Sequence, residues 1–226
     1  WDMVSTYTDY TFNRSHAACY ATIAYQTAYL KANYPYEFMA AFMNSETGDV
    51  ERIAFLIDEC RQMGVEVLPP DINQSFQRFT VVDLDTKPAI RFGLTAVKNV
   101  GENVVINIIQ DRERNGLFAD IEEFVTRIAS KDLNKKSLES LIKCGAMDAF
   151  GERNMLLANM DNLLSYARDK QKHHSTGQVS LFGGSTEIVM PPLRLAPAEP
   201  IANWEKLMWE KELLGLFVSA HPLNEY

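Results

Sequence analysis

Residue types that bind phosphate cluster near the start of the chain, in FNRSHA at residues 12–17. Asn13, Arg14, Ser15 and His16 all carry hydrogen-bond donors, and Arg14 adds a positive charge. The residues that follow predict a helix over 17–34, and the free N–H groups at its start would attract a phosphate to the same place. The alternative is an ordinary helix cap beside one solvated arginine, and the residues alone leave it open.

A second segment, GLTAVKNVGE at residues 93–102, has the pattern of a helix-hairpin-helix. Apolar residues on both sides of a tight turn would hold two helices together. We predict that the turn touches DNA phosphates without reading bases, through Lys98, Asn99, Val100, Gly101 and Glu102. A plain pair of helices without a ligand is the alternative. A weaker copy of the pattern lies at residues 138–150, with its turn at 143–146.

A third segment places Gln178, Ser180, Leu181 and Phe182 in a stretch rich in Gly, Pro, Ser and Thr. An extended peptide with a polar anchor and two apolar side chains can dock into a hydrophobic groove of a partner. Such a flexible stretch could not bury these side chains in its own core. We therefore expect a short protein-binding motif there.

Catalytic and metal-binding patterns are weak. Asp83 and Asp85 could hold Mg²⁺, but they lie at a predicted hairpin tip, where aspartate favours turns. His173 and His174 have no further ligand at a suitable spacing. We find no nucleophile–histidine or phosphate-loop pattern, so we assign no catalytic residue and no metal ligand to this chain.

Composition narrows the class of protein. The chain has 226 residues, of which 46% are hydrophobic and 23% charged, as in globular proteins. Its net charge of −8 argues against a protein that coats nucleic acid non-specifically. Three widely spaced cysteines predict neither a disulfide framework nor a zinc site and favour a reducing, cytoplasmic environment. No apolar run is long enough for a membrane span, and no signal peptide is visible.

Periodicity predicts a mainly α fold with a small β-hairpin. Helices are expected over residues 17–34, 36–44, 49–63, 93–114, 120–129, 134–143, 153–172 and 204–214. Two strands, 76–82 and 89–92, would form the hairpin. Residues 173–203 read as a linker or exposed loop. The first residue already looks like structured sequence, so we expect a piece of a longer protein.

Taken together, these segments resemble the C-family of bacterial replicative polymerases, the DNA polymerase III alpha subunits. The quoted blocks follow in the family's order, and they are FNRSHA, GVEVLPPDIN, GLTAVKNVGE, LIKCGAMDAFG, QVSLFGG and ELLGLFVSAHPLNEY. The resemblance covers essentially the whole chain. Thr11 stands where the family commonly has Gly, and Arg14 replaces a more frequent Lys, which keeps the charge.

The resemblance implies four parts. Residues 1–70 would be the C-terminal part of the fingers domain, and residues 71–172 a helix-hairpin-helix domain that binds duplex DNA and carries the β-hairpin. Residues 173–203 would be a flexible loop with the clamp-binding motif. Residues 204–226 would form a helix that leads into a downstream OB domain.

The resemblance also implies a role in template-directed DNA synthesis. Asn13, Arg14, Ser15 and His16 would lie near the incoming deoxynucleoside triphosphate or the template. Residues 98–102 would touch primer-template duplex, and the motif at 178–182 would bind the sliding clamp, the beta subunit. Other replisome subunits would be partners. The catalytic Mg²⁺ would sit in an upstream palm domain, so this piece alone would be inactive.

Two rival interpretations remain at this point. The chain could be a non-catalytic helical scaffold whose hairpin binds nothing. It could also be a freestanding helix-hairpin-helix repair enzyme, but that function needs a catalytic Lys or Asp beside the hairpin, and we find no convincing candidate.

Overall fold

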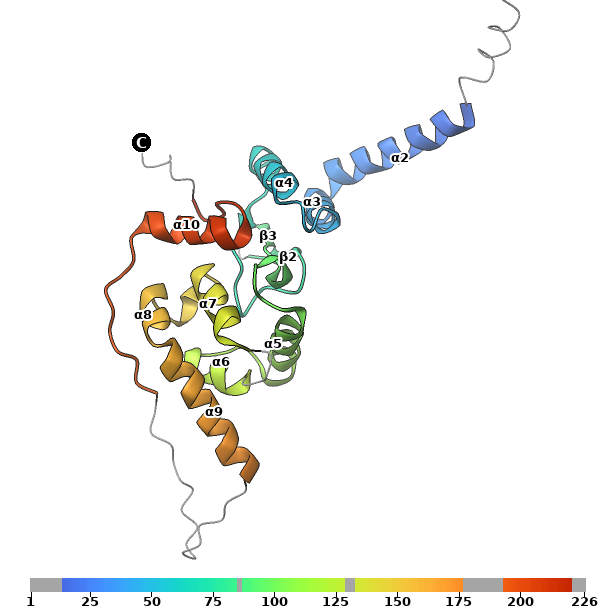
Figure 1. Ribbon diagram of the computed structural model, residues 1–226. Coiled ribbons are helices and arrows are strands. Elements are labelled where there is room, and N and C mark those ends of the chain that lie inside the picture. The colour runs from blue at the N-terminus through green and yellow to red at the C-terminus, as the bar shows by residue number, and fades with distance from the viewer. Residues whose placement is uncertain (1–13, 85–86, 129–132, 177–192, 221–226) are drawn as a thin grey trace, which may run out of the picture.

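The computed structural model describes residues 14–84, 87–128, 133–176 and 193–220, and this part is mainly helical with one small sheet (Figure 1). This confirms the expected fold class. The α-helices are α2 (Arg14–Asn33), α3 (Pro35–Ser45), α4 (Val50–Gln62), α5 (Glu102–Asn115), α6 (Ile121–Arg127), α7 (Lys135–Lys143), α8 (Arg153–Ala158), α9 (Met160–Thr176) and α10 (Asn203–Leu214). The strands are β1 (Val67–Leu68), β2 (Thr80–Asp83) and β3 (Pro88–Arg91), and two 3₁₀ turns are η1 (Leu94–Ala96) and η2 (Asp148–Phe150).

Helix α2 extends away from the rest of the molecule as a rod (Figure 1). It begins three residues before the expected start, so Arg14, Ser15 and His16 form its first turn. None of its residues is buried. Between Arg14 and Lys31 it carries no charged residue, and Lys31 pairs with Glu59 of α4 near the base of the rod.

Helices α3 and α4 cover the sheet. Met39 and Met43 of α3 are fully buried, and Asp49 caps α4 by accepting a hydrogen bond from the N–H of Arg52 at 3.0 Å. The side chain of Asn44 brackets Phe79 just before β2, donating to its carbonyl at 2.8 Å and accepting from its N–H at 2.9 Å. These bonds fix the helices to the strand that follows.

The sheet has three strands in the order β1-β3-β2. The predicted hairpin is confirmed, because β2 and β3 are antiparallel, with Val81 opposite Ile90, but its first strand begins at Thr80 and not at residue 76. The parallel pairing of β1 with β3, which places Val67 opposite Ile90, was not predicted. Two residues are too few to show the alternation that identifies a strand in sequence.

The prediction of a helix from residue 93 onward is wrong at its start. Only η1 forms there, and α5 begins at Glu102, after an extended turn. The reason is a close approach of two backbones at Gly93. A Cβ at that position would lie 2.6–2.7 Å from backbone atoms of Gln77 and Arg78, so the chain runs flat against that segment.

The expected single helix over 153–172 is also wrong, because it breaks into α8 and α9 at Asn159. The Asn159 amide donates to the carbonyl of Met155 at 2.8 Å and to that of Ala196 at 2.9 Å. Its Oδ1 accepts from the N–H of Ala196 at 2.9 Å. A side chain that bonds a distant segment in this way interrupts the helix, and the sequence gives no sign of it.

The segment 193–202, which we call the strap, has no regular secondary structure but is bonded to several helices (Figure 1). The N–H of Leu193 donates to Glu122 at 3.2 Å, and Asn162 donates to the carbonyl of Arg194 at 3.0 Å. Asn154 donates to the carbonyl of Glu199 at 2.7 Å. The expected linker over 173–203 is therefore wrong at its start, where residues 173–176 continue α9, and its described end, the strap, is anchored to the helices.

The cysteines yield a first prediction. Cys19 is exposed, whereas Cys60 and Cys144 are buried, and burial raises the pKa of Cys60 to about 11 and that of Cys144 to about 12. Because the thiolate is the reactive form, a disulfide reagent at pH 8 should modify one thiol rapidly, and Cys19→Ser should remove that reaction. All three should react in denaturant. A second fast thiol in the folded protein would contradict this packing.

Candidate nucleic-acid interface

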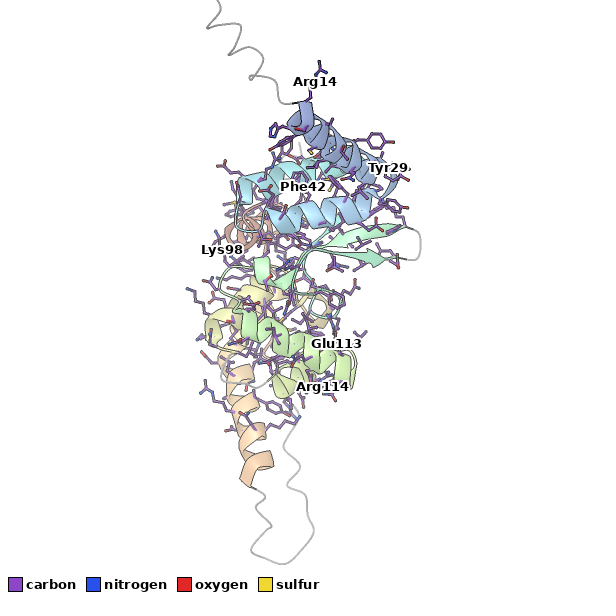
Figure 2. All side chains as sticks on the ribbon, turned by 90° about the vertical axis from the view of Figure 1, so that its right-hand side faces the viewer. Arg14, Tyr29, Phe42, Lys98, Glu113 and Arg114 are labelled. Carbon is purple, nitrogen blue, oxygen red and sulfur yellow. The ribbon has the colours of Figure 1, made fainter. Side chains whose placement is uncertain are left out.

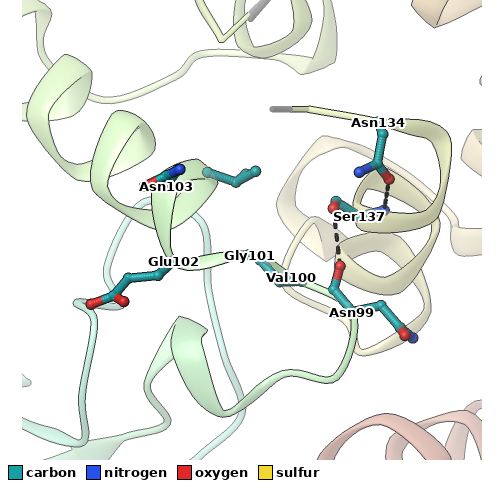
Figure 3. A pocket seen from close by; sticks show the side chains of 8 residues that line it. Asn99, Val100, Gly101, Glu102, Asn103, Asn134 and Ser137 are labelled. Atoms are coloured by element: carbon teal, nitrogen blue, oxygen red, sulfur yellow. Dashed lines mark hydrogen bonds between the residues drawn. The ribbon is translucent and has the colours of Figure 1, made fainter. Parts of the chain in front are cut away.

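The turn at residues 97–101 lies between η1 and α5 (Figure 3). The N–H of Val100 donates to the carbonyl of Val97 at 3.3 Å, and the Val100 side chain is 7% exposed. Asn99 has a φ of 65°, in the left-handed region that asparagine tolerates better than most residues. Val100 thus anchors the turn from inside and does not offer its N–H to a ligand.

Two neighbouring helices hold this turn in place. The Ser137 hydroxyl of α7 donates to the carbonyl of Asn99 at 3.0 Å (Figure 3). The Asn99 amide donates to the Ser140 hydroxyl at 3.3 Å. From the other side, the N–H of Lys98 donates to the carbonyl of Leu213 in α10 at 3.0 Å. The backbone of the turn is therefore fixed before any ligand arrives.

The start of α5 is open. Gly101 is its N-cap residue, with a φ of −71°, and no side-chain hydrogen bond caps this end. The N–H groups of Glu102, Asn103 and Val104 have no acceptor within the helix, and the helix dipole makes this end partly positive. A Cβ built on Gly101 meets no atom within 4 Å, so an incoming group can reach the backbone.

The start of α7 faces the same space. A hollow of about 560 Å³ is lined by Asn99, Val100, Gly101, Glu102, Asn103, Val104, Asn134 and Ser137 (Figure 3). Asn134 caps α7 by accepting from the N–H of Ser137 at 2.9 Å. Lys135 and Lys136 follow on the exposed surface. Two helix starts border the hollow, and this arrangement favours an anion.

The two charged side chains at the turn, Lys98 and Glu102, would act on a phosphate in opposite ways. Lys98 is exposed and has no ion-pair partner within the described ranges, so its side chain is available to an anion. Glu102 is also exposed, and its carboxylate would repel a phosphate. Glu102 was predicted to touch a DNA phosphate, and only its backbone N–H suits that contact.

The second, weaker hairpin pattern is not a comparable surface. In its turn, Cys144 and Ala146 are buried, and the Ala146 carbonyl accepts from the N–H of Ile72 at 2.8 Å. Gly145 has a φ of +86° and lies directly against the guanidinium of Arg153. This turn packs inside the protein, so a DNA backbone cannot reach it.

A buried charge cluster joins that second turn to α10. Arg153 donates to both carboxylate oxygens of Asp148, at 2.8 and 2.7 Å, and to the carbonyl of Lys143 at 3.0 Å. Its second partner is Glu210 at 3.4 Å, which is 1% exposed and also accepts from the N–H and hydroxyl of Ser219. Burial alone would lower the pKa of Arg153, but Asp148 and Glu210 outweigh it and raise that pKa.

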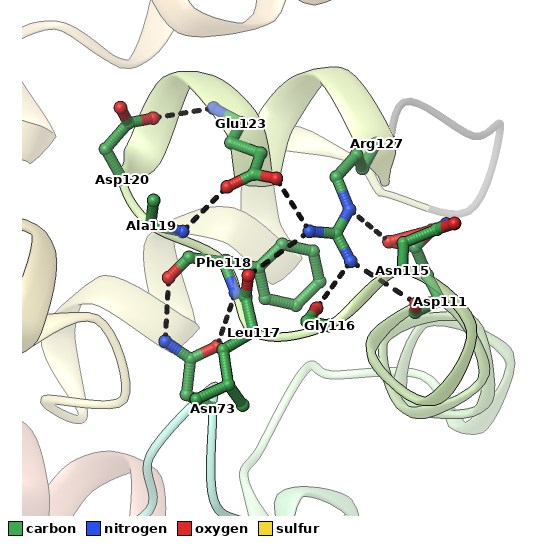
Figure 4. A network of polar contacts seen from close by, with 10 residues as sticks. All are labelled: Asn73, Asp111, Asn115, Gly116, Leu117, Phe118, Ala119, Asp120, Glu123 and Arg127. Carbon is green, nitrogen blue, oxygen red and sulfur yellow. Dashed lines mark hydrogen bonds and ion pairs between the residues drawn. The ribbon is translucent and has the colours of Figure 1, made fainter.

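A second arginine fixes the loop between α5 and α6 (Figure 4). Arg127 pairs with Asp111 at 2.6 Å and Glu123 at 2.9 Å, and it donates to the carbonyl of Gly116 at 2.7 Å. Its guanidinium also lies 4.2 Å from the ring centroid of Phe118. We did not predict this role of Arg127 from the sequence, although the spacing of Glu123 and Arg127 is that of a helical ion pair.

The structure separates the first candidate cluster from the hairpin. Arg14, Ser15 and His16 lie at the outer end of α2, whose 20 residues span about 30 Å, whereas Lys98 lies on the main body (Figure 2). The His16 ring contacts Tyr20, with centroids 4.4 Å apart. Asn13, the fourth member, lies outside the described residues, as do Gln178, Ser180, Leu181 and Phe182 of the third segment.

Two further tests concern metals and membranes. Within residues 14–84, 87–128, 133–176 and 193–220, no group of three or more His, Cys, Asp or Glu residues is arranged to hold a metal ion. Asp83 is the last residue of β2 and pairs with Pro88 in the hairpin, while Asp85 lies outside the described part. No described helix is long and apolar enough to cross a bilayer.

Comparison with known proteins points to the region that contains the turn at residues 97–101. A helix-hairpin-helix motif family matches residues 64–156. The chain is 44% identical over 226 residues to the DNA polymerase III subunit alpha of Thermus aquaticus, covering 100% of the chain and 18% of that protein. The chain is 42% identical to the DNA polymerase III subunits alpha of Deinococcus radiodurans and of Campylobacter jejuni. Each match covers 100% of the chain, and it covers 17% of the first relative and 19% of the second. The chain thus spans about a fifth of their length.

Proposed function

Because the chain is homologous along its whole length to one segment of bacterial DNA polymerase III alpha subunits, we propose that it is the duplex-binding segment of a replicative DNA polymerase. The observation that supports this most is the open start of α5. Gly101 leaves the N–H groups of the first turn uncapped and reachable, and Lys98, three positions earlier, has no ion-pair partner among the described residues.

In this proposal one phosphate of the DNA backbone enters the hollow at Gly101. Backbone N–H groups at the helix start donate to its oxygens, and Lys98 adds a charge-assisted contact. Asn99 and Val100 shape the turn, with Ser137 and Ser140 holding it in the geometry that the phosphate needs. Such contacts involve no base edge, so binding does not depend on sequence.

The binding function has a direct test. The 226-residue chain should bind two duplexes of equal length and unrelated sequence with the same affinity in a fluorescence anisotropy titration. The affinity should fall steeply with salt because phosphate contacts release counterions. An absence of binding at low salt would contradict the proposal and favour a scaffold without DNA contact.

We also propose that Asn13, Arg14, Ser15 and His16 contact the incoming deoxynucleoside triphosphate or the template. Arg14, Ser15 and His16 lie at the outer end of α2, away from the main body, and this supports contact with another part of the longer protein or with its substrate. In that longer polymerase, Arg14→Ala should raise KM for nucleotide or lower kcat, and Arg14→Lys should retain most activity because it keeps the charge. Unchanged kinetics in Arg14→Ala would favour a simple solvated arginine.

The motif at 178–182 is proposed to bind the sliding clamp, with Gln178 and Ser180 as polar contacts and Leu181 and Phe182 as apolar anchors. Replacing Leu181 and Phe182 by Ala should remove binding to immobilised clamp in surface plasmon resonance, because two buried side chains supply about 3–6 kcal/mol before ordering costs. Val179→Ala is the matched control and should bind normally. Clamp binding by the double variant would contradict the motif.

Nucleotide transfer belongs, in this proposal, to the longer protein. The resemblance to the polymerase family implies that the Mg²⁺ of the reaction is held by a palm domain upstream of this segment. The chain alone should therefore show no primer extension.

A further inference from the structure

A second hollow lies along α5, beyond the hairpin. It measures about 460 Å³ and is lined by Phe76, Gln77, Arg78, Thr80, Ile106, Ile109 and Gln110. One wall is α5, which faces the viewer in Figure 2, and the other is the segment that leads into β2. The lining is part apolar and part polar, with one cation and no carboxylate.

Phe76 gives the hollow a flat aromatic surface. Phe76 is 42% exposed, so part of its ring is open to a ligand. The guanidinium of Arg112 lies over the ring at 5.0 Å from its centroid, and Arg112 is itself buried and donates to the carbonyl of Ile72 at 3.0 Å. The ring is thus supported by a fixed cation while part of its surface stays open.

The wall that carries Phe76 is preformed. The carbonyl of Phe76 accepts from the N–H of Leu94 at 3.0 Å, and that of Gln77 accepts from the N–H of Thr95 at 3.1 Å. The backbone at Arg78 lies directly against Gly93. A ligand would therefore meet the aromatic surface in place and would not have to order it.

The polar lining indicates the chemistry of the occupant. Arg78 is exposed and has no ion-pair partner among the described residues, while Gln77, Thr80 and Gln110 offer donors and acceptors. An aromatic platform beside an unpaired cation and amide groups suits a nucleotide, which has a flat base with polar edges and a negative phosphate. An apolar peptide would leave the cation and the amides without partners.

The hollow is also near the hairpin. Gly101 and Gln110 lie on the same helix, and nine residues of helix span about 13 Å, a distance of a few nucleotides. We propose that this hollow binds one unpaired nucleotide of the DNA held at the hairpin, with the base stacked on Phe76 and a phosphate paired with Arg78. The proposal rests on duplex binding at Gly101.

The test compares a blunt duplex with the same duplex carrying a short single-stranded extension, by fluorescence anisotropy with the 226-residue chain. Extensions on the 5′ and 3′ ends are tested separately. We expect one of them to bind about tenfold more tightly than the blunt duplex, the gain typical of one stacked base. Phe76→Ala and Arg78→Ala should remove this gain, and Phe76→Trp should keep it, while blunt-duplex binding stays unchanged in all three.

Phe55→Ala is the matched control, because Phe55 is also exposed and has Arg52 over its ring at 5.2 Å, but it lies on α4. It should change neither affinity. Equal binding of blunt and extended duplexes, or a gain that survives Phe76→Ala, would overturn the nucleotide site and leave a protein segment as the occupant. If the wild-type chain did not bind the blunt duplex at all, this would instead contradict the proposal that the turn at Gly101 binds duplex DNA.

Discussion

Gly101→Val should weaken duplex binding by at least tenfold while the protein keeps its fold. The new side chain would fill the open space through which a phosphate reaches the start of α5. Because Gly101 has a φ of −71°, valine fits its backbone without strain, and the loss of a glycine N-cap costs about 1 kcal/mol or less. Anisotropy titration gives the affinity, and urea unfolding gives the stability.

Ala202→Val is the matched control for that variant. Ala202 is the N-cap of α10, with a φ of −65° and no side-chain cap, and it is exposed like Gly101. It should lose a similar small stability and bind DNA normally. If Gly101→Val bound duplex as tightly as Ala202→Val, the start of α5 would not be the phosphate site.

Arg153→Met should lower the free energy of unfolding by about 3–5 kcal/mol, the loss expected when one member of a buried ion pair is removed. It would leave the Glu210 carboxylate, which is 1% exposed, with only Ser219 as a partner among the contacts described here. Urea unfolding measures the change. The double variant Arg153→Met/Glu210→Met should recover part of the loss because no charge remains buried alone.

Lys135→Met is the control for the effect of charge removal. Lys135 pairs with Asp161 at 2.7 Å, but the two side chains are 58% and 83% exposed, so the loss should stay below about 1 kcal/mol. A loss of that small size for Arg153→Met as well would show that the buried cluster does not hold α10 to the second turn.

Local signals predicted much of the helical fold. Asp49, Asp120 and Asn134 are the first residues of three predicted helices. In the structure each is the N-cap, and its side chain accepts from the backbone N–H three positions further on. Where the sequence failed, a distant residue decides the local structure. Asn159 ends α8 because its amide bonds Ala196, and η1 stays short because Gly93 packs on Arg78.

At the candidate site, too, local features were predicted from the sequence and contacts between distant residues were not. The pattern at 93–102 located the turn, since glycine and lysine at a helix start are local features. It could not show that Val100 and Lys98 use their N–H groups within the protein, or that Ser137 and Ser140 hold Asn99. The bonds of Ser137 and Ser140 reach Asn99 across about 40 positions, and the Lys98 N–H bonds Leu213, which is farther still along the chain, so no local period records these three contacts. Phe76 and Ile109 of the second hollow were missed for the same reason.

The salt dependence of duplex binding tests the central claim most directly. Plotted against the logarithm of salt concentration, the logarithm of the binding constant falls with a slope set by the number of phosphates contacted. Lys98→Ala should weaken binding to all sequences alike and reduce the size of this slope by about one. Lys87→Ala, at an exposed lysine of the β-hairpin, should leave the slope unchanged. Equal slopes for wild type and Lys98→Ala would contradict a phosphate contact at this turn.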